Sequence, residues 1–371
     1  MLNRNRPLDQ KDVDIIGALD RLGGKTSTEE LHQALPNIPA RTIRYRLTKM
    51  REAGDLYPAK TNTHERKLGL GENIILTDTT LGSTPILEEI FKSINSIYYW
   101  SSTYGRFNGC VINSLYSLTT PNVSRRLMEA FQKEGLISKY YIFDATDYEH
   151  KNGDYSRLDP KLGWQYCWSE WHKKIKKNLK SKSIKIHTKC DENPKLIKFD
   201  NSDFGLLRSL FDDALVPQKE LAKRFSLSET QVTKRIRRLE NEGVIKGFGS
   251  SFKTKEPMID FNLYIDIEEP AARIMNNFYV HPFPGSIMQE SRTRWGIRMA
   301  IPAAGFQGFL EGIDLMKPFL KSYALQFFST HHRDKSVHPY DLFNIDTHKW
   351  ETPISDYLAA ISDVMAKHSR K

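Results

Sequence analysis

The sequence predicts an α+β protein that is built from two copies of one plan. Three observations support this prediction: the length, an internal repeat, and the order of helical and strand patterns within each repeat. A chain of 371 residues is long enough for two to three domains at roughly 150 residues per domain. With 39% hydrophobic and 27% charged residues, it has the composition of a globular protein with several cores.

The first half of the chain recurs in the second half. Apolar and charged residues return at matching positions, with an offset that drifts only from 191 to 189: Leu8, Asp9, Asp12, Ile15, Ile16 and Leu19 correspond to Phe199, Asp200, Asp203, Leu206, Leu207 and Leu210, and Leu31, Ile43, Arg46, Leu47, Met50, Gly54 and Leu56 correspond to Leu221, Val232, Arg235, Ile236, Leu239, Gly243 and Ile245. A third match, at an offset of 179, pairs Trp171, Ile175 and Leu179 with Trp350, Ile354 and Leu358. Because a duplication marks its own boundaries, both copies are expected to share one domain order.

Each copy begins with three short helices. In the second copy, the helical pattern covers residues 203–211, 218–225 and 229–241. Ser228 and Gln231 have the S-x-x-Q spacing of a capping box, which satisfies free amides at the start of the third helix. Gly243 ends that helix. The short apolar segments 55–57 and 244–248 suit a strand that begins a wing. We therefore predict a winged helix-turn-helix in each copy.

The third helix of each copy has one apolar stripe. Val232, Ile236 and Leu239 fall at i, i+4 and i+7, and Ile43, Leu47 and Met50 take the same places in the first copy. Polar and basic residues lie off the stripe: Arg41, Thr42, Arg44, Tyr45, Thr48 and Lys49 in the first copy, and Thr230, Gln231, Thr233, Lys234, Arg237 and Arg238 in the second.

After each wing the pattern changes to strand, helix, strand, strand, helix, strand. This is the split βαβ order of a ferredoxin-like (βαββαβ) domain. The expected elements are 74–79, 85–93, 97–102, 110–118, 123–134 and 138–143 in the first copy, and 258–267, 271–278, 286–292, 295–301, 306–320 and 323–329 in the second. The predicted division is 1–68 winged helix-turn-helix, 69–150 ferredoxin-like domain, 151–197 amphipathic basic helix and linker, 198–254 winged helix-turn-helix, 255–335 ferredoxin-like domain and 336–371 C-terminal amphipathic helix.

The positive charge is concentrated between the two copies. The net charge is +10, and residues 172–198 contain ten lysines and two acidic residues, which gives +8 of that total. Trp164, Trp168, Trp171, Ile175 and Leu179 form an apolar face at helical spacing, so the lysines lie on the opposite face. They either keep a linker helix soluble or contact nucleic-acid phosphates, and the phosphate candidates are Lys173, Lys174, Lys176 and Lys177.

Other sequence features exclude several classes of protein. Nowhere do about eighteen apolar residues run together, and the N-terminus lacks the apolar core of a signal peptide, so no membrane partner is expected and the predicted location is cytoplasmic. Three scattered cysteines without a CxxC argue against a disulfide framework and a cysteine zinc site. We predict no metal, no cofactor and no catalytic residue.

The second copy resembles the leucine-responsive (Lrp/AsnC) regulators of bacteria and archaea. The resemblance covers about fifty residues and rests on Phe199-Asp200-x-x-Asp203, Leu221-Ala222, Leu227-Ser228, Val232, Arg235-Ile236, Leu239-Glu240 and the run from Gly243 to Phe248. The first copy departs from the pattern at Ala34-Leu35-Pro36 and at Tyr57-Pro58-Ala59. The resemblance implies a nucleoid-associated regulator that binds double-stranded DNA. Because members commonly act as dimers, it implies a dimer fused into one polypeptide, with further homo-oligomerisation left open.

The resemblance also implies a ligand-sensing domain. Members form an effector pocket, commonly for an amino acid, at a glycine-containing turn between the second and third strands. Here Tyr104, Gly105, Arg106 and Asn108 occupy that turn in the first copy, whereas the corresponding turn near Gly296 departs clearly. A plain hairpin turn is the competing interpretation.

Two alternatives stay open at this stage. Siroheme decarboxylases of haem biosynthesis share the architecture and also occur as fused pairs; they rely on a histidine and an arginine near the same hairpin. The second copy has Arg292 and Arg294 without a histidine in the strand pair, and the first copy has Arg106 alone. The other alternative is an architectural DNA-binding protein without sequence preference. The resemblance favours the sequence-specific regulator. Because the side chains on the two third helices differ, we also predict an asymmetric DNA site.

Overall fold

The computed structural model describes residues 7–181, 185–191, 193–250, 252, 256–268, 270–328, 333–334 and 338–368. It confirms the predicted α+β class, with two winged helix-turn-helix units and two ferredoxin-like domains. Two of the predicted domain boundaries, 254/255 and 335/336, lie outside the described residues, as does Ser329 in the last predicted strand.

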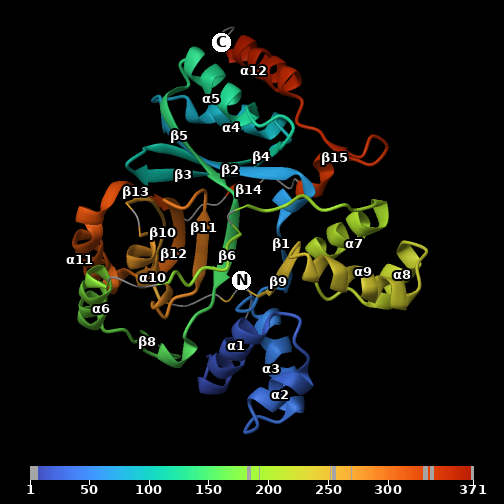
Figure 1. Cartoon of the computed structure of the whole chain (residues 1–371), viewed down its shortest axis with the longest axis vertical. Coiled ribbons are helices and arrows are strands. Elements are labelled where there is room, and N and C mark those ends of the chain that lie inside the picture. Colours follow the sequence, from blue (N-terminus) through green and yellow to red (C-terminus); the bar gives the residue numbers. More distant parts are fainter. Residues whose placement is uncertain are drawn as a thin grey trace.

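Two three-helix units project from the rest of the molecule (Figure 1). The first contains α1 (Gln10–Leu22), α2 (Thr28–Ala34) and α3 (Ala40–Glu52). The second contains α7 (Asn201–Asp212), α8 (Gln218–Arg224) and α9 (Glu229–Asn241). The stripes predicted on the third helices, Ile43, Leu47 and Met50 in α3 and Val232, Ile236 and Leu239 in α9, are buried.

The wings differ from the prediction in the first copy. A strand over residues 55–57 is wrong: Leu56 makes only an isolated bridge to Phe252, and Pro58, which has no backbone N–H, follows closely. The wing strand is instead β1 (Lys60–Thr63), and it pairs antiparallel with β9 (Ile245–Gly249) of the second copy. The two wings therefore form one two-stranded ribbon that joins the copies.

Both ferredoxin-like domains have the predicted element order. The first contains β2 (Leu70–Thr79), α4 (Thr84–Ser93), β3 (Ile97–Gly105), β4 (Gly109–Ser117), α5 (Val123–Lys133) and β5 (Ile137–Ala145). The second contains β10 (Met258–Ile267), α10 (Ala272–Tyr279), β11 (Gly285–Gln289), β12 (Arg294–Pro302), α11 (Phe306–Met316) and β13 (Leu320–Phe328). Every neighbouring pair of strands is antiparallel.

The strands of the two domains join into one sheet. Its order in the described residues is β5-β2-β4-β3-β13-β10-β12-β11-β6, and β14 (Arg333–Asp334) also pairs with β3. The path ends on β6 (Asp147–Lys151), which follows β5 after the single residue Thr146. Thr146 donates its backbone N–H to the carbonyl of Gln289 at 2.8 Å. The two ends of the sheet path, β5 and β6, are therefore consecutive segments of the chain.

Alternation along the strands gives the sheet two apolar faces. Ile74, Leu76, Phe143, Tyr264 and Met288 lie in one cluster between the two halves of the sheet, with contributions from both copies. Their neighbours along the chain, such as Ile75 and Ile265, belong to clusters beneath the helices.

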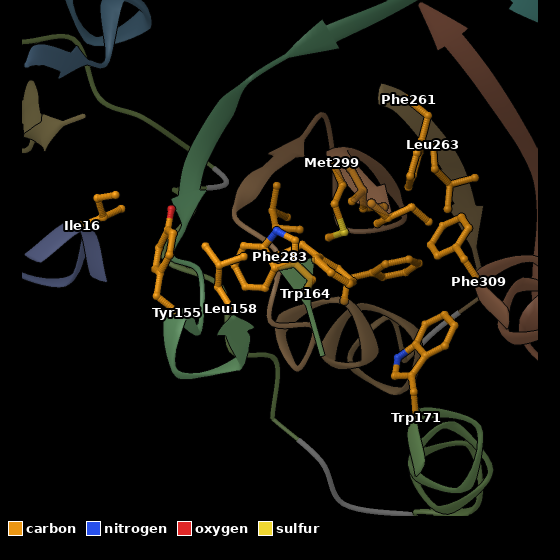
Figure 2. Close-up of a cluster of buried hydrophobic side chains, with 14 of the residues drawn as sticks. Ile16, Tyr155, Leu158, Trp164, Trp171, Phe261, Leu263, Phe283, Met299 and Phe309 are labelled. Carbon is orange, nitrogen blue, oxygen red and sulfur yellow. The ribbon is translucent and has the colours of Figure 1, made fainter. Parts of the chain in front are cut away.

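Each copy covers the outer helices of the other copy. Helix α6 (Trp168–Lys180) follows the first ferredoxin-like domain but packs against α10 and α11 of the second. Helix α12 (Ile354–His368) follows the second domain but packs against α4 and α5 of the first. Trp171 of α6 is 1% exposed, stacks on Phe309 and donates its indole N–H to the carbonyl of Asn277 at 2.9 Å (Figure 2).

A short segment before each of these helices forms a second exchanged contact. The first strap, residues 155–164, holds a 3-10 turn (Tyr155–Arg157), β7 (Leu158–Asp159) and β8 (Gly163–Trp164). The second strap, residues 339–350, holds a 3-10 turn (Pro339–Leu342), β15 (Phe343–Asn344) and β16 (Lys349–Trp350).

The first strap connects the first helix-turn-helix to the second ferredoxin-like domain. Tyr155 packs beside Gly17 of α1, where an added Cβ would lie 3.0 Å from the Tyr155 Cβ. Leu158 and Trp164 continue this contact to Phe283, as Figure 2 shows. The second strap does the same between the second helix-turn-helix and the first ferredoxin-like domain: Tyr340 packs on Phe204, and the Trp350 indole donates to the Leu68 carbonyl at 2.7 Å.

The straps correct the third sequence match. Trp350 lies in β16 and corresponds to Trp164 in β8, at an offset of 186, whereas Trp171 corresponds to Tyr357 in α12. The match of Trp171 to Trp350 was wrong by seven residues. Seven residues are about two helical turns, so the slipped alignment kept the same apolar periodicity.

Removing the Trp171 side chain is expected to destabilise the second ferredoxin-like domain. Trp171→Ala leaves a cavity against Phe309 and an unpaired Asn277 carbonyl, so we expect a loss of about 3–5 kcal/mol in the free energy of unfolding, measured by urea denaturation. Lys174→Ala, on the exposed face of the same helix, is the control and is expected to change stability by less than about 0.5 kcal/mol. Equal losses in the two variants would contradict the exchanged packing.

Stability is expected to fall in mild acid because of His281. This side chain is 3% exposed, its ring lies 4.3 Å from that of Trp171, and neither ring nitrogen has a hydrogen-bond partner in the described residues. Burial, aided by the charge of Lys151, lowers the pKa of His281 well below 6.5. The unfolded chain takes up a proton below pH 6.5 that the folded chain refuses, so stability decreases there by at most about 1.4 kcal/mol per pH unit.

The measurement is the free energy of unfolding between pH 7 and pH 5. His281→Phe keeps an aromatic ring in the cluster and is expected to reduce the acid-side decrease. The exposed His187→Phe is expected to leave it unchanged. An identical pH profile for wild type and His281→Phe would refute the assignment.

Candidate nucleic-acid interface

The same ion-pair arrangement holds the third helix of each copy. In the first copy, Arg46 of α3 donates to Asp9 at 2.7 Å and to Asp12 at 2.8 Å. These two carboxylates also form the capping box of α1. Because the pairs bind α3 to the start of α1, Arg46 orients this third helix and does not face outward.

The second copy repeats this arrangement. Arg235 of α9 donates to Asp200 at 2.9 Å and to Asp203 at 2.8 Å, and these carboxylates cap α7. The hydrogen bond to Asp203 is the largest cause that raises the pKa of Arg235, so the guanidinium stays charged. Asp203 is buried, which makes the pair part of the core of the unit.

In the first copy, the predicted side chains lie on the outer face of α3. Arg41, Arg44, Tyr45, Thr48 and Lys49 are exposed and Thr42 is half-buried. Tyr45 is 60% exposed, which is unusual for a large aromatic ring. Arg44 pairs with Glu29 at 3.3 Å and Lys49 with Glu52 at 2.7 Å, all four on the surface. Such exposed pairs contribute little to stability, so both cations are free to turn to another anion.

In the second copy, four of the six predicted residues are exposed. These are Thr230, Gln231, Lys234 and Arg237. The Gln231 carbonyl oxygen accepts from the Ser228 backbone N–H at 2.8 Å, which confirms the capping box. Thr233 is half-buried and donates its hydroxyl to Gln218 at 2.7 Å.

Arg238 differs from the other members of the predicted set. Its guanidinium donates to Asp203 at 2.5 Å and to the Lys198 carbonyl at 3.2 Å. It therefore lies with Arg235 on the side of α9 that faces α7. The sequence did not distinguish Arg238 from Arg237, because both residues lie off the apolar stripe.

The four lysines of α6 lie apart from the third helix of either copy. Lys173, Lys174, Lys176 and Lys177 are exposed. In Figure 1, however, α6 lies beside α11 on the left, whereas α7, α8 and α9 lie on the right and α3 at the bottom. This arrangement disfavours phosphate contacts between α3 and α9.

The turn predicted to bind an effector lies at the seam between the copies. Gly105 has a φ of +144°, and an added Cβ would lie 2.2 Å from the Leu325 carbonyl. Arg106 donates to the Tyr323 carbonyl at 3.0 Å, and Asn108 accepts from the Gly105 N–H at 3.3 Å. Tyr104 is exposed. Gly105 and Arg106 therefore hold the turn against β13, whereas Asn108 closes the turn on itself.

The structure also shows polar residues that sequence reasoning missed. Between the two halves of the sheet lies a cavity of about 200 Å³, bordered by Glu72, Tyr98, Asn113, Asn262 and Arg298 among others. Burial raises the pKa of Glu72. The sequence contained one signal for such a site: Glu72 occupies an inward position of a strand in which the neighbouring inward residues, Leu70 and Ile74, are apolar.

Two further properties concern only the described residues. No cluster of three or more histidine, cysteine, aspartate or glutamate side chains there has the arrangement of a metal site. None of the helices in that part of the chain combines the length and the apolar character that a bilayer crossing requires.

Comparisons with known proteins identify the class of the second helix-turn-helix. Residues 199–246 match the family of winged helix-turn-helix DNA-binding domains. The HTH-type transcriptional regulator LrpA of Pyrococcus horikoshii is 43% identical over 49 residues, which are 13% of this chain and 35% of that protein. The match thus spans about a third of the relative's length. It confirms the resemblance to the leucine-responsive regulators for this domain.

Two solved structures are similar to this chain at low sequence identity. The siroheme decarboxylase NirDL covers 96% of this chain and 99% of its own, with 15% identity and a TM-score of 0.49. AsnC of E. coli covers 38% of this chain and 94% of its own, with 18% identity and a TM-score of 0.29.

The adjacent residues Arg237 and Arg238 are expected to behave oppositely when replaced by glutamine. Arg238→Gln removes two charge-assisted hydrogen bonds on a partly exposed side chain, so we expect a loss of roughly 1 kcal/mol in the free energy of unfolding. Arg237 forms no hydrogen bond or ion pair with the described residues, so Arg237→Gln is expected to leave the free energy of unfolding within about 0.5 kcal/mol of wild type. Urea denaturation of both variants measures this difference, and a reversed order would contradict the geometry.

Proposed function

We propose that this protein is a sequence-specific regulator of transcription that binds double-stranded DNA as a dimer fused into one chain. The observation that carries the proposal is the pair of recognition helices, α3 and α9, each with an exposed polar and basic face. Arg46 and Arg235 hold these helices in the same way in both copies. The matched DNA-binding domain at residues 199–246 supports the same function.

The exposed side chains have the chemistry that base recognition requires. An α-helix fits the major groove of B-form DNA, where arginine binds guanine and glutamine binds adenine in bidentate fashion. Arg41 and Arg44 of α3 and the Gln231 amide of α9 suit such contacts. Lys234, Arg237 and Lys49 suit the phosphates beside the groove.

The proposed DNA site is asymmetric. The face of α3 carries Arg41, Arg44 and Tyr45, whereas that of α9 carries Gln231, Lys234 and Arg237. Because the chain fuses the two helices, one molecule reads two unlike half-sites in a fixed order. A location at the nucleoid in the cytoplasm and control by a small effector follow as parts of this proposal, and a homo-oligomer built on the fused dimer is compatible with it.

Two double variants test the assignment of each helix to one half-site. Selection of duplexes from a random pool is expected to yield a bipartite site with unlike halves. Arg41→Gln with Arg44→Gln is expected to weaken binding roughly 10–100-fold and to relax base preference in one half. Lys234→Gln with Arg237→Gln is expected to do the same in the other half. Footprints and dissociation constants at fixed salt provide the measurement.

The four lysines of α6 provide the matched control. Replacing Lys173, Lys174, Lys176 and Lys177 by glutamine removes four exposed positive charges, and we expect the salt dependence of binding to stay unchanged. A flatter slope would show that α6 contacts phosphates. A palindromic site with equal halves would refute the asymmetric assignment, and equal affinity for random duplex would indicate an architectural protein. A Soret band after incubation with siroheme, together with the absence of specific DNA binding, would favour the alternative of a siroheme-decarboxylase-like enzyme.

A further inference from the structure

A pocket of about 610 Å³ lies where the first helix-turn-helix, the wing ribbon and the linker between the copies meet. Its walls come from the end of α1 and the turn that follows, from β1 and β9, from β6, and from the segment 185–191. We call it the junction pocket. Among the described residues that line it, none was predicted for base recognition, for phosphate contacts or for the effector turn.

The acidic residues of the junction pocket already have partners within the protein. Asp20 contacts the His150 ring nitrogen at 2.9 Å, and Glu149 accepts from the Lys189 backbone N–H at 2.7 Å. Glu30 belongs to the capping box of α2. Because other groups of the protein satisfy these carboxylates, they do not need the side-chain cations of the pocket.

Three cations of the junction pocket have no such partner. They belong to three separate segments: Arg21 to the last turn of α1, Lys25 to the turn that follows, and Lys189 to the segment 185–191. All three residues are exposed, and none of them forms a side-chain hydrogen bond or an ion pair with another described residue. The pocket therefore brings like charges together without an anion between them, and an anionic ligand would relieve their repulsion.

The fold fixes the position of Lys25 beside the ribbon. The Gly24 backbone N–H donates to the Phe248 carbonyl of β9 at 2.6 Å, and the Lys25 ammonium lies 4.7 Å from the centroid of the Phe248 ring. Partial burial lowers the pKa of Lys25; the charge of Glu240 opposes this effect, but the two residues form no ion pair. A partly buried ammonium without a paired anion gains free energy when an anion binds beside it.

The second copy lacks these cations at the equivalent positions. The last turn of α1 contains Arg21, whereas the last turn of α7 contains no basic residue. In the turn that follows α7, Leu215 takes the place of Lys25. Neither Leu215 nor any residue of α7 lines the junction pocket. A helix-turn-helix unit of this kind therefore does not need the cations to fold, and they mark one site per chain.

We propose that the junction pocket binds the diphosphate group of a small molecule. A diphosphate carries several charged oxygens on two neighbouring phosphorus atoms, so it can pair at once with cations from separate segments. Here these cations are Arg21, Lys25 and Lys189. The backbone of β9 leaves room for the group, because an added Cβ on Gly247 would have no neighbour within 4 Å.

The rest of the junction pocket suits a nucleoside attached to the diphosphate. A volume of 610 Å³ equals the space of about twenty water molecules at roughly 30 Å³ each, which is more than a diphosphate fills. The aromatic residues Phe248 and Tyr148 and the amide residue Asn62 line the pocket. Aromatic rings stack on nucleobases, and an amide can bind a base edge.

Isothermal titration of the full chain with four probes tests the proposal. ADP carries the diphosphate with a nucleoside, pyrophosphate carries it alone, AMP has a single phosphate, and citrate is a polyanion without phosphorus. We expect ADP and pyrophosphate to bind at one site per chain and roughly tenfold more tightly than AMP and citrate. The buffer contains EDTA and no DNA, so the result depends neither on a metal complex nor on the proposed regulatory function.

The two diphosphate probes also identify the source of the group. Tighter binding of ADP than of pyrophosphate would support the proposal with a nucleotide as the ligand. Equal affinities would support it with the diphosphate alone as the recognised group.

Two variants connect binding to the named cations. Lys25→Gln and Lys189→Gln are each expected to weaken binding of the better probe roughly fivefold, because each removes one charge-assisted contact. Lys11→Gln is the matched control: it removes one exposed positive charge from α1 outside the pocket and is expected to bind like wild type. Circular dichroism confirms that each variant folds, and the exposed positions of all three residues favour this.

Several outcomes would overturn the proposal. These are no binding of ADP and pyrophosphate at millimolar concentration, equal affinity for citrate, two sites per chain, and wild-type affinity in the folded double variant of Lys25→Gln with Lys189→Gln. Equal loss in Lys11→Gln would show that binding follows net charge. If the probes do not bind but the double variant weakens DNA binding, the cations contact the DNA backbone instead.

Discussion

The structure depends on one constraint: neither copy can bury its own apolar surfaces. Trp171 of α6 needs Phe309 of the other copy, and an added Cβ on Gly312 would lie 1.8 Å from its ring, so the fit allows no larger residue. Tyr357, Ile361 and Val364 of α12 need α4 and α5 in the same way. Since apolar burial is the main favourable term in folding, the two copies stabilise each other and form one unit.

The same exchange fixes the two helix-turn-helix units relative to the sheet. Each strap connects one unit to the ferredoxin-like domain of the other copy, and the ribbon of β1 and β9 lies between them. A buried carboxylate anchors this ribbon: Asp147 of β6 pairs with Lys246 of β9 at 2.6 Å and contacts His64, which follows β1. A buried pair of this kind fixes one geometry, because leaving Asp147 without its partner is costly.

Particular residues show how far sequence reasoning reaches. The helices and strands could be predicted because capping boxes and apolar periods are local signals; Ser228 and Gln231 are an example. The exchange of α6 and α12 between the copies could not be predicted. The apolar stripe of Trp171 and Ile175 indicates that one face of the helix is buried, but it does not indicate which element covers that face. In the candidate interface, the sequence does not distinguish the exposed Arg237 from Arg238, because the ion pair of Arg238 depends on the position of Asp203 in the folded structure. Glu72 looks like a solvent-facing strand residue until the sheet closes around it.

The position of α12 has a consequence for synthesis of the protein. Lys367 and Glu89, which contact each other across α12 and α4, are separated by 278 residues in the chain. During translation, the apolar face of α4 and α5 stays uncovered until the ribosome has made α12. Contacts between such distant segments slow folding and leave apolar surface open to aggregation. The first half of the chain is therefore expected to be most prone to aggregation before α12 has been made.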